Sequence, residues 1–74
     1  MKKIETKLKD VYIIESDCFG DNRGWFMETY NEAKFHEMGI DNVFVQDNMS
    51  YSAKKGTLRG LHYQRAPYSQ AKLV

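Results

Sequence analysis

The 74-residue sequence is poor in the residues that reinforce small proteins through disulfides or metal ions: it has one cysteine and two histidines. With Cys18 alone, neither an internal disulfide nor a cysteine-based zinc site can form. The histidines, His36 and His62, are far apart in the sequence, so a histidine-cluster metal site is not supported. We therefore expect no metal centre, and the lone thiol weakly indicates a reducing compartment.

Neither sign of charge is in excess, since 11 Lys and Arg stand against 10 Asp and Glu for a net charge of +1. Such a balance gives no extended field to attract nucleic acid or an anionic membrane. Long apolar runs are missing as well, because Glu5, Lys7, Lys9 and Asp10 interrupt the segment where a signal peptide or membrane span would begin. We expect a cytoplasmic protein with no nucleic-acid or membrane partner.

The chain is also short for a self-sufficient core. A domain of this size buries only about 60% of the surface that its unfolded chain exposes. Residues 71–74 (AKLV) read as the opening of a strand, with no Gly, Pro or charge cluster after it. We therefore expect residues 1–74 to be the N-terminal part of a single, longer domain.

The pattern along the chain predicts a mainly β protein with one short helix. Asn31 is a good N-cap, Phe35 and Met38 share a helix face, and Gly39 suits the position after a helix end, which together predict a helix over 31–38. Gly, Asp and Asn make 19–24 a loop. Runs of β-branched and aromatic residues predict strands at 11–14, 25–30, 43–48, 57–64 and 71–74. Such spacing favours a barrel or sandwich over a βαβ fold.

Polar side chains alternate along the predicted strand 43–48. Gln46 and Asn48 fall on one face with Phe44, whereas Asp47 falls on the other. Two amides on one face of a barrel strand either bind a polar ligand or satisfy neighbouring backbone groups. The spacing leaves both interpretations open.

Basic side chains mark the segment 58–64 (LRGLHYQ). Strict alternation places His62 and Arg59 on opposite faces, unless a bulge at Gly60 shifts the parity and turns both toward one pocket. An imidazole beside fixed cations, here Arg59 and Lys72, is suited to removing a proton next to a carbonyl and holding the resulting negative charge. The alternative is a structural histidine and a surface arginine.

Arg23 and Glu28 bracket the aromatic pair Trp25 and Phe26. A guanidinium suits phosphate, an aromatic ring can stack on a base, and a carboxylate can accept a sugar or imide donor. A surface salt bridge beside a core aromatic would give the same pattern.

Four segments taken together resemble the dTDP-4-dehydrorhamnose 3,5-epimerase family, in order and spacing from Phe19 to Val74. They are 19–24 with 28–30, 44–48, 58–64 and 72–74. The resemblance implies a cupin-like jelly-roll barrel that forms a homodimer. It also implies a cofactor-independent isomerase that epimerises a dTDP-linked 4-keto-6-deoxyhexose at C3 and C5 in rhamnose biosynthesis.

The same resemblance assigns roles to particular residues. His62 would be the general base, Lys72 would stabilise the enolate oxygen, and Arg59 would lie near the sugar or diphosphate. Arg23 and Glu28 would contact the nucleotide across the subunit interface. The segment lining the sugar-nucleotide site would contain Gln46, Asp47 and Asn48.

The sequence departs from the family pattern in three respects. Met49 stands where relatives usually carry a second histidine, and Ala71 where they usually carry glycine. In the family, the tyrosine that returns the proton and the aspartate that orients the base lie beyond residue 74. We therefore predict that residues 1–74 alone are inactive, or fold only as an assembly.

Two other functions stay open at this point. A C3-only epimerase or a 3,4-ketoisomerase of related sugar nucleotides would need the same base and cations. A non-catalytic β-rich module, which buries its edges against another chain, could also retain the motif.

Overall fold

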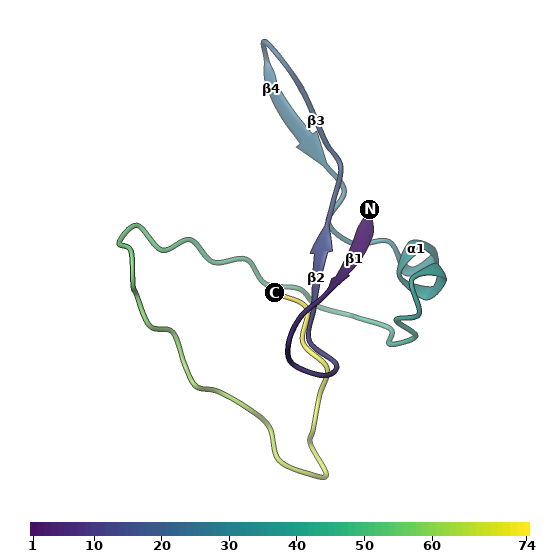
Figure 1. Cartoon of the computed structure of the whole chain (residues 1–74), viewed down its shortest axis with the longest axis vertical. Coiled ribbons are helices and arrows are strands. Elements are labelled where there is room, and N and C mark those ends of the chain that lie inside the picture. Colours follow the sequence, from purple (N-terminus) through teal and green to yellow (C-terminus); the bar gives the residue numbers. More distant parts are fainter. The chain divides into compact units, whose positions relative to one another are not determined.

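The computed structural model describes residues 1–74 in two compact units, 1–41 and 42–74, which are considered separately. The first unit contains all of the regular structure: β1 (Lys2–Glu5), β2 (Tyr12–Glu15), β3 (Cys18–Asp21), β4 (Gly24–Met27) and α1 (Glu32–Glu37). The strands form two antiparallel pairs, β1 with β2 and β3 with β4 (Figure 1). The predicted mainly β character with one short helix is confirmed.

The β1–β2 hairpin pairs Lys2 with Glu15 and Ile4 with Ile13. Opposite charges lie across the strands, with Lys2 Nζ 3.7 Å from Glu15 Oε2. The loop is closed by Thr6, whose hydroxyl donates to the Val11 carbonyl at 2.8 Å. The predicted strand 11–14 is therefore confirmed one residue later, and its partner β1 was not predicted. Three of the four residues at 2–5 (KKIE) are charged, so the sequence gives no apolar strand signal there.

The β3–β4 hairpin replaces the predicted loop 19–24, and that prediction was wrong in part. Only Asn22 and Arg23 separate the strands, and Gly24 has φ +140°, which glycine alone adopts readily. The turn is closed by Asp21, whose Oδ1 accepts from the Arg23 backbone N–H at 2.8 Å. The turn residues were recognised correctly, but the strands extend into them because pairing satisfies their backbone groups. The predicted strand 25–30 accordingly ends at Met27.

Helix α1 forms as its end signals predict. The Asn31 side chain accepts from the Lys34 N–H at 3.1 Å, and Gly39 after the helix has φ +84°. Phe35 is the one buried residue, 1% exposed, and its ring packs edge-on against Tyr30 with centroids 4.7 Å apart. Met38, predicted to share its face, is half-buried, and His36 is exposed.

Residues 42–74 contain neither helix nor strand (Figure 1). The predicted strands 43–48, 57–64 and 71–74 are therefore wrong for the structure as it stands. A strand exists only when its backbone groups pair with a neighbour. Between segments 43–48 and 71–74, Asn48 N donates to Leu73 O at 3.4 Å, but no strand ladder forms. Segment 57–64 has no strand partner, so Gly60, with φ +127°, is not a bulge in a ladder.

Candidate active site

The turn of the β3–β4 hairpin holds the first predicted site residue, Arg23. Its Nη2 and Nε both donate to Asp21 Oδ2, at 2.7 and 3.1 Å. The Arg23 hydrogen bonds hold the pKa of the Asp21 carboxyl below its ordinary value. Beside the pair lies a depression of about 290 Å³ with three aromatic walls, Phe19, Trp25 and Phe26, which are 66 to 72% exposed. A guanidinium beside exposed aromatic rings can hold a base and a phosphate.

Glu28 lies between β4 and α1, half-buried and held by the helix. Its Oε1 accepts from Lys34 Nζ at 2.8 Å, and its Oε2 accepts from Asn31 Nδ2 at 3.4 Å. Lys34 foremost, and then Asn31, lower the pKa of Glu28, while Glu28 raises the pKa of Lys34. The Glu28 carboxylate is therefore ionised and oriented. Glu28 is paired with Lys34 and not with Arg23. The two charged residues that flank Trp25 and Phe26 therefore belong to two separate ion pairs.

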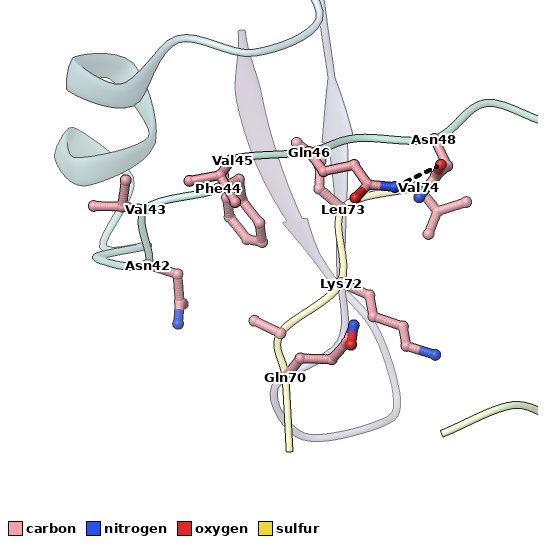
Figure 2. A pocket seen from close by; sticks show the side chains of 11 residues that line it. Asn42, Val43, Phe44, Val45, Gln46, Asn48, Gln70, Lys72, Leu73 and Val74 are labelled. Atoms are coloured by element: carbon pink, nitrogen blue, oxygen red, sulfur yellow. Dashed lines mark hydrogen bonds between the residues drawn. The ribbon is translucent and has the colours of Figure 1, made fainter. Parts of the chain in front are cut away.

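A hollow of about 590 Å³ lies within the second unit (Figure 2). The segments 42–48 and 70–74 line it. Gln46 and Asn48 both contribute, and Gln46 Nε2 donates to Asn48 Oδ1 at 3.5 Å. Asp47 does not line the hollow, as alternation predicts. The two amides thus meet on one surface, and each keeps polar atoms for a ligand.

Lys72 connects this hollow with a second one of about 440 Å³, which His62 lines. Figure 2 shows the Lys72 side chain extending away from the Gln46 and Asn48 pair. Its Nζ donates to the backbone carbonyl of His62 at 2.9 Å. The predicted base and the predicted cation, ten residues apart in sequence, are thus neighbours. Gly60 also lies close to His62, because a Cβ at this position would be 3.7 Å from His62 Nδ1.

Arg59 is held elsewhere in the same unit. Its Nε donates to Ser52 Oγ at 2.8 Å, and its Nη2 donates to the Tyr51 carbonyl at 2.9 Å. It does not line the hollow that contains His62 and Lys72. The suggestion that a bulge turns Arg59 and His62 into one pocket is therefore not borne out by this arrangement.

Four partners of the site residues were missed by sequence reasoning: Asp21, Asn31, Lys34 and Ser52. Asp21 could have been found, because an Asp side chain in a turn commonly accepts from the backbone N–H two residues on, here that of Arg23. Ser52 gave no signal, since it lies seven residues from Arg59 in an irregular segment. Among the acidic, cysteine and histidine side chains, no group of three or more is arranged to hold a metal ion. None of the helical structure has the length and hydropathy that crossing a membrane requires.

Comparison with known proteins shows which family the chain resembles. The family model described as dTDP-4-dehydrorhamnose 3,5-epimerase matches residues 5–74. The chain belongs to this epimerase family. It is 55% identical to the dTDP-4-dehydrorhamnose 3,5-epimerase of Shigella flexneri over 75 residues, which cover 100% of this chain and 41% of that protein. It is 51% identical to the Escherichia coli K12 enzyme, covering 100% and 40%.

A solved epimerase structure is similar as well. The crystal structure of the Bacillus anthracis dTDP-4-dehydrorhamnose 3,5-epimerase, with TDP and PPi bound, matches with a TM-score of 0.72 and 48% identity. The match covers 92% of this chain and 39% of that one. The chain thus spans about two fifths of the length of the relatives that it matches. This agrees with the predicted cupin-like, mainly β fold class of the epimerase family.

Proposed function

We propose that this chain is the N-terminal part of an enzyme that epimerises dTDP-4-dehydro-6-deoxyglucose at C3 and C5, giving dTDP-4-dehydrorhamnose. Membership of the epimerase family supports the reaction class. One structural observation carries the assignment to particular residues: Lys72 Nζ donates to the backbone carbonyl of His62 at 2.9 Å, and both residues line one hollow.

The chemistry follows from these two groups. The imidazole of His62 takes the proton from the carbon beside the C4 carbonyl, and the electron pair of the broken C–H bond moves into an enolate. The Lys72 ammonium stabilises the negative charge on the enolate oxygen. Return of a proton to the opposite face of the carbon inverts its configuration. Only protons are transferred in these steps, so the proposed reaction needs no cofactor.

The remaining predicted residues bind the substrate in this proposal. The segment that contains Gln46, Asp47 and Asn48 borders the sugar-nucleotide site, where Gln46 and Asn48 line the hollow and Asp47 does not, and Arg59 contacts the sugar or the diphosphate. The two amides that meet in the larger hollow support this placement.

Arg23 and Glu28 contact the nucleotide of the partner subunit in a homodimer. The exposed aromatic walls beside Arg23 support such a contact, since rings left in solvent are suited to a base or a second chain. The cytoplasmic location expected from the sequence stays a prediction.

Burial supports the proposal that further structure completes the domain. Phe35 is the one buried residue of 1–74, whereas Val45 and Leu61 are 95 and 97% exposed. A chain with one buried residue has not formed a core that offsets its conformational entropy. We therefore expect no turnover by residues 1–74 alone.

The test uses a chimeric enzyme, called the fusion enzyme below, in which this chain replaces the matching segment of the Shigella flexneri relative, aligned over 75 residues. Proton abstraction is followed as incorporation of solvent deuterium at C3 and C5 of the substrate. His62→Asn should lower exchange at both carbons by about 10²- to 10⁴-fold. The matched control is His36→Asn, because His36 is the other histidine and is exposed on α1; its exchange rate should stay unchanged.

Three outcomes would overturn the proposal. Full exchange in His62→Asn would remove the catalytic role of His62. Exchange at C3 alone would indicate a C3-only epimerase. A folded fusion enzyme without any exchange would favour the non-catalytic module.

A further inference from the structure

The Arg59 side chain is held by two separate hydrogen bonds to a segment earlier in the chain. The guanidinium donates from Nε to the Ser52 hydroxyl at 2.8 Å and from Nη2 to the Tyr51 carbonyl at 2.9 Å. Both acceptors lie seven or eight residues before Arg59, within the same unit.

The two bonds fix more than the position of the charge. Two donors on different nitrogens of a planar group define the plane of the fork as well as its direction. A guanidinium has five N–H donors, and these bonds use one on Nε and one on Nη2. The Nη1 pair and the second Nη2 hydrogen stay available, side by side, for the oxygens of an anion.

We infer that Ser52 is a positioning residue, which orients the Arg59 fork toward the diphosphate of the sugar nucleotide. This inference rests on the proposed function and deepens it, because Arg59 was expected near the sugar or the diphosphate. Tyr51 contributes through its backbone carbonyl, which a side-chain substitution does not remove, so the Ser52 hydroxyl is the contact that mutation can test.

The first experiment compares Ser52→Ala with Ser52→Thr in the fusion enzyme. Losing one hydrogen bond of this kind should raise KM by about 3- to 10-fold with kcat changed by less than about twofold, because the diphosphate is bound equally in the ground and transition states. Thr keeps the hydroxyl and should restore KM. Ser69→Ala is the matched control, since Ser69 is an exposed serine of the same unit, and it should behave as the unmodified enzyme.

The second experiment asks whether the effect concerns the diphosphate. Ser52→Ala should weaken binding of dTDP by about 3- to 10-fold and leave binding of thymidine, which lacks phosphate, unchanged. In an Arg59→Lys background the same change should have no further effect, since an ammonium cannot present the fork.

The results separate this inference from the proposed function. Equal weakening of dTDP and thymidine, or failure of Ser52→Thr to restore KM, would show that Ser52 only maintains the fold and would overturn the inference. An additive loss in Arg59→Lys would do the same. A fusion enzyme without epimerase activity would refute the proposed function, while the dTDP and thymidine comparison would still decide the role of Ser52.

Discussion

Packing of the Phe35 ring should contribute strongly to the stability of α1, and Phe35→Ala tests this. The ring is 1% exposed and packs edge-on against Tyr30, with centroids 4.7 Å apart and planes 77° apart. Removing a buried phenyl ring typically lowers the free energy of unfolding by about 3–5 kcal/mol. The edge-on contact with Tyr30 contributes about 0.5–1.5 kcal/mol of that loss.

The expected shift in melting temperature follows from these values. The fusion enzyme has about 180 residues, since 75 residues make up 41% of the relative. In chains of roughly 150–250 residues, 1 kcal/mol corresponds to about 2–4 °C. Phe35→Ala should therefore lower Tm by about 6–20 °C, as measured by circular dichroism or calorimetry.

A conservative variant separates volume from ring geometry. Phe35→Leu keeps most of the apolar volume and should lose less than half as much stability as Phe35→Ala. A double-mutant cycle with Tyr30→Leu should give a coupling of about 0.5–1.5 kcal/mol. An unchanged Tm for Phe35→Ala would refute the argument that this ring anchors the helix.

Three further predictions concern the residues around the site. Asn31→Ala should destabilise α1 by about 0.5–2 kcal/mol through loss of the N-cap, as measured by chemical denaturation, and Asn31→Ser, which keeps a capping oxygen and adds no charge beside Glu28, should lose less; equal losses for both would contradict the capping role. Lys34→Met should raise the pKa of Glu28 toward its ordinary value, because the Lys34 hydrogen bond is the largest cause of its lowering. A carboxyl group whose pKa is lowered by folding adds stability at pH values above its unfolded-state pKa, and this stability is lost as the pH falls through the folded-state pKa. The loss of stability in acid that is due to Glu28 should therefore be smaller in this variant. A carboxyl NMR titration unchanged by the substitution would disprove the pairing. Lys72→Met should lower kcat about 10²- to 10³-fold, the usual effect of losing one charge-stabilising donor, and a kcat within about twofold of the unmodified enzyme would remove Lys72 from the mechanism.

Local sequence signals predicted the parts of the fold that local interactions build. The helix over 31–38 was predicted because its cap, its apolar face and its terminal glycine all act within a few residues. Val11 to Ile14 was predicted as a strand because β-branched and aromatic side chains favour extended backbone. The order and spacing of the four family segments were sufficient by themselves to indicate the epimerase family.

Pairing, in contrast, depends on residues distant in sequence, and tertiary structure alone decided it. The segments 43–48 and 57–64 have strand-forming sequences, yet their backbone groups find no ladder within residues 1–74, so they are not strands. The side-chain partners of the site residues lie nearer in sequence, with Arg23 bound to Asp21, Glu28 to Lys34 and Arg59 to Ser52. Only the first of these follows from a local turn signal. Residue types fix what chemistry each side chain can perform, whereas the partner that orients it is chosen by which atoms the folded backbone brings within hydrogen-bond distance.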